Sequence, residues 1–258
     1  MAPVAGNGER NEVLYGVHAV REALRSGNRP LLKLMIAGQD HRYVDIVRLA
    51  RAARIAIHVE PRRALDRLVP EGKHQGIIAV VATKRYVDPE DILQYARTAG
   101  EAPFMVILDG VEDPQNLGAV LRNAEAAGVH GVFIPARRAA GLSGTVAKAS
   151  AGAVEHLRVG CVQNVPRLIE RLQKEGLWIY GLDSFAEKRY TALDLSGPIG
   201  LVFGSEGKGI RPGVLEKCDE RARIPMRGKV SSLNVSAAAA VVLFEAVRQR
   251  TTPQWQED

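Results

Sequence analysis

The sequence predicts an α/β protein built on a parallel sheet with helices on both faces, and two observations support this prediction. Short apolar runs alternate with amphipathic segments along almost the whole chain, the pattern of repeated strand and helix units. The apolar runs are continuous, as in FMVILDG (104–110) and IGLVFG (199–204), which indicates strands buried on both faces. With 258 residues, of which 46% are hydrophobic, the chain is long enough for one large or two modest domains.

The first series of elements occupies residues 13–83. The expected strands are 13–16, 31–38, 55–59 and 76–83, and the helices between them are 17–27, 43–53 and 62–69. Residues 85–103 then combine a proline-containing polar start, one short amphipathic helix and a Gly/Pro exit. We therefore expect a domain over 1–85, a linker over 86–103 and a second domain over 104–258.

The second series shows the same alternation. The expected strands are 104–110, 131–135, 156–162, 177–183, 199–204 and 222–226, and the helices are 116–127, 145–150, 165–175, a short one after Pro212 and a long one from about 236. In parallel sheets, ligands bind beyond the carboxyl ends of the strands. Each polar motif of this region follows such an end, so we expect the functional site there.

The basic charge is concentrated in the first third of the chain. The net charge is +6, and residues 1–85 contain 15 Lys and Arg against 8 Asp and Glu, while residues 86–258 contain 20 against 21. A nucleic-acid-binding module and an ordinary solvated basic face explain this distribution equally well. Aromatic residues make up only 5%, which argues against a platform that stacks single-stranded bases.

The remaining composition excludes several classes of protein. The two cysteines, Cys161 and Cys218, lie far apart and show no spacing typical of a disulfide framework or a zinc site. The start of the sequence lacks the apolar core of a signal peptide, and no stretch is apolar enough for a membrane span. We expect a cytoplasmic protein without a membrane anchor.

The first polar motif is DGVEDPQNLGAVLRNAEAAGVHGVFIP (109–135). Asn116 is suited to cap the helix that follows the turn. Arg122 lies between the apolar residues Leu121 and Ala124. Its long side chain can extend from a packed helix to solvent, or, at a site beyond the strand ends, hold a phosphate or an oxygen nucleophile.

The second motif is GLVFGSEGKGI (200–210). It does not match the Walker A pattern, and its glycines run in the order GxxGxG rather than GxGxxG. A nucleoside-triphosphatase therefore loses its best support. The motif predicts a tight glycine turn after a strand, with Glu206 at the tip and room for the backbone to approach a ligand.

The third motif, MRGKVSSLNVSAAAA (226–240), opens the final helix. Four residues there favour helix N-termini: Gly228, Ser231, Ser232 and Asn234. One cap needs one residue, so the others are available to a ligand. A helix N-terminus also offers free N–H groups and a positive dipole end to a polar ligand.

Four segments together resemble the motifs of the SpoU-type RNA ribose 2′-O-methyltransferases. They are, in order, DPQNLGAVLRNAEAAG, KASAGAVE, LVFGSEGKGI and IPMRGKVSSLNVSAAAAV, and the resemblance covers residues 104–250. It implies a catalytic domain with a deep C-terminal trefoil knot. VLYGVHAVREAL and HQGIIAVVA resemble, over a shorter stretch, the L30e-like RNA-binding domain of the 23S rRNA guanosine-2′-O-methyltransferase branch, whose members modify the peptidyl-transferase P loop.

The resemblance also implies a cofactor and partners. In the family, S-adenosylmethionine is enclosed by a knotted loop that corresponds to 224–234, with backbone contacts at positions matching Gly204, Ile224 and Leu233. We assign Gly207 and Ser232 to the same site. The expected partners are RNA, with 23S rRNA favoured, and a second copy of the chain bound through the catalytic domain and its terminal helix. No metal is expected.

The matching catalytic residues are Asn116, Arg122, Glu206, Ser232 and Asn234. Family proposals make the arginine the general base. A guanidinium pKa above about 12 argues against deprotonation, so we favour Arg122 acting with an RNA phosphate to orient the ribose hydroxyl. Asn116 would then fix Arg122 or the ribose, and Glu206, Ser232 and Asn234 would position the hydroxyl and the methionine end of the cofactor.

Three alternatives remain open at this point. A tRNA ribose is the rival substrate, and a non-catalytic RNA-binding protein is the rival use of the fold. The presence of all five matching residues favours catalysis over binding alone. A nucleotide-binding oxidoreductase lacks its glycine fingerprint.

Overall fold

The computed structural model describes residues 11–38, 41–70 and 73–251. The chain divides into two compact units. Unit 1 comprises Met1–Arg85 and Gly141–His156, and unit 2 comprises Tyr86–Ala140 and Leu157–Asp258. Among the described residues, no helix combines the length and apolar character needed to cross a membrane.

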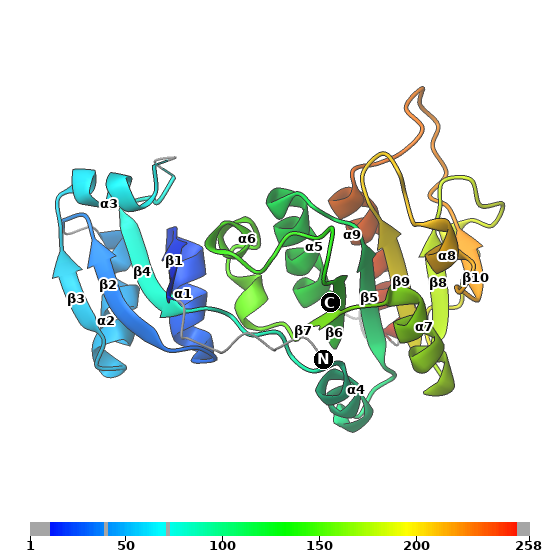
Figure 1. Cartoon of the computed structure of the whole chain (residues 1–258), viewed down its shortest axis with the longest axis horizontal. Helices are drawn as coiled ribbons and strands as arrows, with labels where there is room; N and C mark the ends of the chain where they lie inside the picture. Colours follow the sequence, from blue (N-terminus) through cyan, green and yellow to red (C-terminus); the bar gives the residue numbers. More distant parts are fainter. Residues whose placement is uncertain (1–10, 39–40, 71–72, 252–258) are drawn as a thin grey trace, which may run out of the picture. The chain divides into compact units, whose positions relative to one another are not determined.

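Unit 1 contains a four-stranded mixed sheet (Figure 1). Its N-terminal elements are β1 (Asn11–Tyr15), α1 (Val17–Ser26), β2 (Leu31–Ile36), η1 (His41–Tyr43), α2 (Val44–Ala52), β3 (Ala56–Val59), α3 (Arg62–Leu68) and β4 (Ile77–Ala82). The strand order is β1-β4-β2-β3, in which β4 runs antiparallel to β1 and β2, and β3 runs parallel to β2. The alternation predicted for 13–83 is thus confirmed, and β3 is an edge strand.

The chain returns to unit 1 through Gly141–His156, which carries α6 (Gly144–Ala149) and η2 (Ala153–Glu155). Helix α6 lies directly against β1, because a Cβ atom at Gly144 would overlap the backbone carbonyl of Val13. The hydroxyl groups of Tyr15 and Thr145 are hydrogen-bonded at 3.0 Å. The segment Gly141–His156 is therefore part of the core of unit 1.

A buried ionic network joins this segment to the N-terminal strands. Glu155 is fully buried, and its Oε1 accepts a hydrogen bond from Arg29 Nη2 at 2.6 Å. Arg29 Nη1 donates to Glu12 Oε2 at 3.0 Å, and Lys84 Nζ donates to the main-chain oxygen of Glu155 at 3.2 Å. Burial raises the pKa of Glu12 and lowers that of Lys84. We call Glu12, Arg29, Lys84 and Glu155 the buried ionic network.

Unit 2 contains a six-stranded sheet in which all neighbours are parallel (Figure 1). Its elements are α4 (Pro89–Thr98), β5 (Phe104–Asp109), α5 (Pro114–Ala126), β6 (Gly131–Pro135), β7 (Val159–Val162), α7 (Val165–Lys174), β8 (Trp178–Leu182), η3 (Tyr190–Ala192), β9 (Ile199–Gly204), α8 (Pro212–Leu215), β10 (Glu220–Ala222) and α9 (Val235–Arg250). The strand order is β10-β8-β9-β5-β6-β7. The predicted parallel sheet is confirmed.

Helices cover both faces of this sheet. Ile92 of α4, Leu168 of α7 and Val214 of α8 pack in one core cluster with Met105 and Ile107 of β5. Alternate residues of a strand point to opposite faces, so the intervening residues of β5 face the other side. Helices α5 and α9, which contact each other and contribute nothing to that cluster, lie there, and α9 also contacts β9.

Several predicted boundaries differ from the structure by a few residues, and three of them have a clear cause. The last strand is Glu220–Ala222 instead of 222–226, because the chain leaves the sheet before Pro225, whose nitrogen cannot donate a ladder hydrogen bond. Helix α5 begins at Pro114 rather than at 116. Strand β7 begins at Val159 rather than at 156, since the preceding residues form η2 of unit 1.

Candidate active site

The candidate site begins at the carboxyl ends of two central strands. β5 and β9 are neighbours, and their last residues, Asp109 and Gly204, are paired in register. The loops that follow the two strands therefore leave the sheet side by side. This is the edge at which a parallel sheet places its ligands.

The loop after β9 is a compact turn with Glu206 at its tip. Ser205 and Gly209 exchange two backbone hydrogen bonds, of 3.0 and 2.9 Å. A Cβ atom at Gly204 would overlap the backbone of Gly209 and Ile210, so the missing side chain is required by the loop's own packing. Gly207 has φ +76°, which favours glycine. The tight turn agrees with the sequence prediction. Gly204 and Gly207 are required by the conformation of the loop itself, whether or not a ligand approaches it.

An ion pair that the sequence did not reveal fixes the end of this loop. Asp109 is buried, and its Oδ1 accepts from Arg211 Nε at 2.8 Å and from Nη2 at 2.5 Å. Its Oδ2 accepts from the backbone N–H of Arg211 at 2.8 Å. The hydrogen bonds to Asp109 raise the pKa of the Arg211 guanidinium. In the sequence, Asp109 is recognisable only as an aspartate at the end of an apolar strand. That position does not indicate that Arg211 is its partner.

The start of α5 corrects the prediction that Asn116 caps this helix. Asp113 is the N-cap, and its carboxylate accepts from the backbone N–H groups of Gln115 and Asn116 at 3.3 and 3.2 Å. The helix begins at Pro114, so Asn116 lies within the first turn. Because Asp113 satisfies the free N–H groups, the half-buried Asn116 side chain is available for other contacts.

The start of α9 shows which residue of the third motif is the cap. Asn234 Oδ1 accepts from the backbone N–H and the hydroxyl of Ser236, at 2.9 and 2.6 Å. Asn123 of α5 donates from Nδ2 to the main-chain oxygen of Ser236 at 2.9 Å. The prediction that one of the four motif residues caps the helix is confirmed, and the supporting roles of Asn123 and Ser236 were not predicted.

Three predicted catalytic residues meet above the strand ends. Asn116 Nδ2 donates to Glu206 Oε1. Asn234 Nδ2 donates to Asn116 Oδ1 at 3.0 Å and to Glu206 Oε1 at 3.2 Å. We call Asn116, Glu206 and Asn234 the amide–carboxylate cluster. The Glu206 carboxylate thereby lies at the N-termini of both α5 and α9, where the helix dipoles favour negative charge.

The other two predicted catalytic residues do not join these hydrogen bonds. Leu121 and Ala124 are buried, and the helical phase turns Arg122 outward, where its side chain is exposed. Ser232 is exposed as well. Neither side chain forms a hydrogen bond with another residue of the described ranges. The suggested contact between Asn116 and Arg122 is not formed, since Asn116 bonds to Glu206 and Asn234.

The segment 224–233 could hold a polar ligand through its backbone. Within the described part of the chain, its N–H and C=O groups form no hydrogen bonds. Ile224 is half-buried, and Leu233 is exposed. Free donors and acceptors interleaved with apolar side chains suit a ligand with an aromatic base and a polar tail. These features fit an adenosine-containing cofactor such as S-adenosylmethionine.

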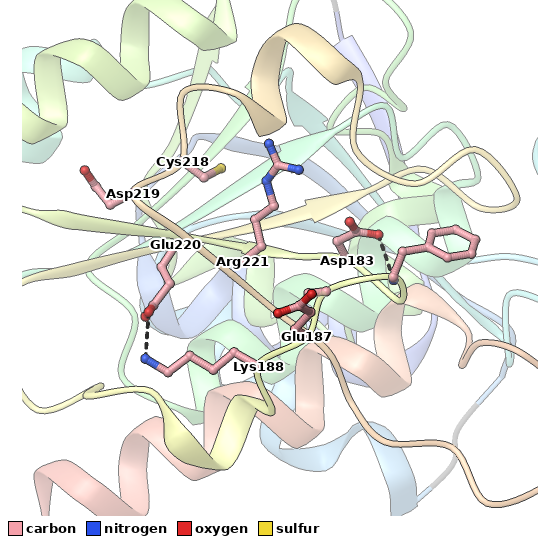
Figure 2. Close-up of a pocket in the computed structure, with 9 residues that line it drawn as sticks. Asp183, Glu187, Lys188, Cys218, Asp219, Glu220 and Arg221 are labelled. Atoms are coloured by element: carbon pink, nitrogen blue, oxygen red, sulfur yellow. Dashed lines mark hydrogen bonds and ion pairs between the residues drawn. The ribbon is translucent and has the colours of Figure 1, made fainter.

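A polar depression also occurs in unit 2, near the ends of β8 and β10 (Figure 2). Asp183, Lys188, Cys218 and Glu220 are among its lining residues, and Lys188 Nζ pairs with Glu220 Oε1 at 2.6 Å. Burial raises the pKa of the Cys218 thiol to about 12, so this sulfur remains protonated. None of the predicted site residues lines the depression. Its ion pair and its protonated thiol give no reason to prefer it over the amide–carboxylate cluster as the active site.

Comparison with known proteins agrees with the sequence motifs. The family model described as "SpoU rRNA Methylase family" matches residues 103–244. The chain belongs to the SpoU rRNA methylase family. A second model, "RNA 2'-O ribose methyltransferase substrate binding", matches residues 13–87. The predicted resemblance to the SpoU-type methyltransferases is thus confirmed, and the second match indicates a substrate-binding domain over 13–87.

Relatives within the SpoU family match almost the full length. The "Putative TrmH family tRNA/rRNA methyltransferase YacO" of Bacillus subtilis is 43% identical and aligns with 94% of this chain and 97% of its own. The "23S rRNA (guanosine-2'-O-)-methyltransferase RlmB" of Pectobacterium atrosepticum is 44% identical, covering 93% and 99%. The crystal structure of AviRb from Streptomyces viridochromogenes in complex with AdoMet has a TM-score of 0.78 at 25% identity, covering 93% and 90%.

Proposed function

We propose that this chain transfers a methyl group from S-adenosylmethionine to the 2′-hydroxyl of a guanosine in 23S rRNA. The convergence of Asn116, Glu206 and Asn234 at the carboxyl edge of the sheet is the observation that carries the proposal. Full-length relatives named as 23S rRNA guanosine-2′-O-methyltransferases support the choice of substrate.

Backbone groups would hold the cofactor. Ile224 and Leu233 begin and end the segment 224–233, whose N–H and C=O groups form no hydrogen bonds with the residues that the structure describes. We assign to the same site Gly204 at the end of β9, Gly207 in the loop that follows it, and Ser232 before α9. S-adenosylmethionine supplies an electrophilic methyl group on a positively charged sulfur. Because the contacts are mainly with backbone, side-chain substitutions in the cluster should affect methyl transfer more than cofactor binding.

The cluster would act on the ribose hydroxyl, which is a weak nucleophile. Glu206 Oε1 already accepts two amide hydrogen bonds, whereas Oε2 has no partner among the described residues. Oε2 is thus free to accept the hydrogen bond of the 2′-hydroxyl and to draw its proton away as the oxygen–carbon bond forms and the carbon–sulfur bond breaks. Arg122 would orient the ribose through a neighbouring RNA phosphate.

Unit 1 would bind the RNA away from the reacting ribose. Six exposed arginines lie on the segment that runs from α2 through β3 to α3, and none forms a side-chain hydrogen bond or ion pair with another described residue: Arg48, Arg51, Arg54, Arg62, Arg63 and Arg67. They follow one another from the end of α2 to the end of α3. A planar guanidinium matches phosphate geometry and stacks on bases, so these arginines suit folded RNA.

Charge substitution tests this assignment better than truncation does. Removal of residues 1–85 would leave the buried Glu155 without Arg29 and Lys84. We instead expect Arg51→Glu combined with Arg62→Glu to lower the affinity for 23S rRNA at least tenfold and to flatten its salt dependence. The matched control is Arg167→Glu together with Lys174→Glu on α7, where both side chains are exposed and, like Arg51 and Arg62, form no ion pair among the described residues. An equal loss in both variants would count against RNA binding by these arginines.

The enzyme class is tested by cofactor binding. Calorimetry should detect S-adenosylhomocysteine and no binding of NAD, which separates a methyltransferase from an oxidoreductase on a related sheet. Label transfer from S-adenosylmethionine to RNA then separates catalysis from RNA binding alone. Binding of the cofactor without any transfer, on every RNA offered, would support the non-catalytic alternative.

Finer features of the fold and assembly also belong to the proposal. We propose that residues 224–234 form part of a deep trefoil knot and that unit 1 is L30e-like. The boundaries 1–85, 86–103 and 104–258 remain our proposal for the domains along the sequence, while in the compact units 86–103 joins unit 2 and 141–156 joins unit 1. Val241 and Phe244 leave an apolar face of α9 exposed, which supports a homodimer through this helix. Phe244→Asp should then give monomers in sedimentation. A cytoplasmic location would follow from action on ribosomal RNA.

A further inference from the structure

The amide of Asn234 is hydrogen-bonded at both of its ends. Its oxygen accepts from the backbone N–H and the hydroxyl of Ser236, at 2.9 and 2.6 Å. Its nitrogen donates to Asn116 Oδ1 at 3.0 Å and to Glu206 Oε1 at 3.2 Å. Rotation of the amide by 180° would place its oxygen against the Glu206 carboxylate and its NH₂ group against the Ser236 N–H. The contacts therefore allow one orientation only.

The hydroxyl of Ser236 is not needed for helix capping. The backbone N–H of Ser236 already satisfies the cap interaction with Asn234 Oδ1. The additional bond from the hydroxyl brings a second donor to the same oxygen. Its effect is to strengthen the preference for the orientation that leaves the Asn234 NH₂ group facing Glu206.

Asn123 holds the same turn from the neighbouring helix. Asn116 and Asn123 are seven residues apart, so they lie on one face of α5, two turns from each other. The first donates to Glu206, and the second donates from Nδ2 to the main-chain oxygen of Ser236 at 2.9 Å. One face of α5 thus contacts both the cluster and the helix turn that supports it.

We propose that Asn123 and Ser236 are positioning residues for methyl transfer, which they support by fixing the Asn234 amide toward Glu206. The inference rests on the proposed function of the cluster. Neither residue contacts the reacting atoms, and both act through Asn234. The free Glu206 Oε2 then keeps the direction in which it accepts the ribose hydroxyl.

The kinetic test uses Ser236→Ala, Asn123→Ala and two controls. We expect Ser236→Ala and Asn123→Ala each to lower kcat about tenfold. The KM for S-adenosylmethionine and the affinity for S-adenosylhomocysteine should change less than twofold. Ser236→Thr retains the hydroxyl and should recover most of the rate. Glu125→Ala, on an exposed part of α5, should behave like the unaltered protein. A lower Tm with unchanged kcat in both variants would show that the two residues only stabilise the helices.

A spectroscopic measurement separates this proposal from the function on which it rests. In ¹⁵N–¹H spectra, the side-chain NH₂ of Asn234, assigned by its loss in Asn234→Asp, should show slow hydrogen exchange. Ser236→Ala should accelerate that exchange at least tenfold. Unchanged exchange would overturn the positioning role even if the protein methylates RNA. If no RNA is methylated and exchange still accelerates, the proposed function fails while the fixed orientation of the amide holds.

Discussion

Two glutamates, each from a segment that resembles a SpoU motif, have opposite surroundings. Glu155 of unit 1 is fully buried and bonded to Arg29, and Lys84 lies beside it. Glu206 of unit 2 is exposed and bonded to two neutral amides. Cations neutralise the first carboxylate and leave it no access to a ligand. Amides hold the second in place without removing its charge, and one of its oxygens remains free.

The difference indicates how to tell a structural polar cluster from a reactive one in this fold. A buried ion pair is costly to break, because the remaining partner stays buried without compensation. An exposed carboxylate held by amides adds little to folding, so its fixed geometry calls for another explanation. We attribute that geometry to the binding of a substrate hydroxyl.

The largest expected effect on activity follows from Arg122→Ala. The exposed guanidinium forms no contacts that stabilise the described fold, so Tm should stay unchanged while methyl transfer falls at least a thousandfold, about 4 kcal/mol. S-adenosylhomocysteine affinity should remain within twofold. Full activity in this variant would remove Arg122 from the site.

The buried ionic network should show the next largest effect, on stability alone. Arg29→Ala leaves Glu155 buried without its main partner, and we expect the free energy of unfolding to fall by about 3 kcal/mol. This is the low end of the usual range, because Lys84 remains nearby. Arg25→Ala is the matched control, since it removes an exposed pair with Glu22 and should cost below about 0.5 kcal/mol. Equal losses of unfolding free energy in Arg29→Ala and Arg25→Ala would contradict the distinction between a buried and an exposed ion pair.

Glu206→Gln keeps the size of the side chain and removes its charge. We expect kcat to fall about a hundredfold, about 2.7 kcal/mol, with unfolding free energy changed by less than about 0.5 kcal/mol. Glu155→Gln should show the reverse pattern, in which stability falls and the folded fraction keeps its kcat. Denaturant titration and initial rates on the same preparations provide the comparison.

The smallest effect concerns a half-buried ion pair in unit 1. The hydrogen bond from Arg21 lowers the pKa of Asp45, with Nε and Oδ2 separated by 2.5 Å. A lowered folded-state pKa gives stability that is present above the unfolded-state value and is lost as pH falls through the folded-state value. Asp45→Asn should thus cost about 0.5 kcal/mol at pH 7, and this cost should disappear as the pH falls through the lowered folded-state pKa. A constant difference across this range would assign the effect to packing instead.

Much of the fold could be predicted, because buried parallel strands leave continuous apolar runs. The predictable part of the site was the set of polar residues that follow strand ends, and three of them, Asn116, Glu206 and Asn234, do meet. The cap of α5 was assigned wrongly, because Asp113 and Asn116 both have the chemistry of a cap and only the helix start decides between them.

Long-range pairing was not predictable in the same way. The bonds from Arg29 to Glu155 and from Arg211 to Asp109 join residues more than a hundred positions apart, and either arginine could pair with many carboxylates. The return of Gly141–His156 to unit 1 has the same cause, since periodicity defines an element but does not reveal its packing partner. The position of β10 depended on where the chain leaves the sheet, a tertiary effect.

Mapping ribose methylation on RNA tests the central proposal most directly. Unmodified 23S rRNA and bulk tRNA are incubated with labelled S-adenosylmethionine and either the unaltered protein or Glu206→Gln, and the modified nucleotide is located by mass spectrometry. We predict one 2′-O-methylguanosine, in the peptidyl-transferase P loop of 23S rRNA, formed about a hundredfold more slowly by the variant. Label confined to tRNA, or on a nucleotide other than guanosine, would contradict the proposed substrate, and equal rates would contradict the proposed site.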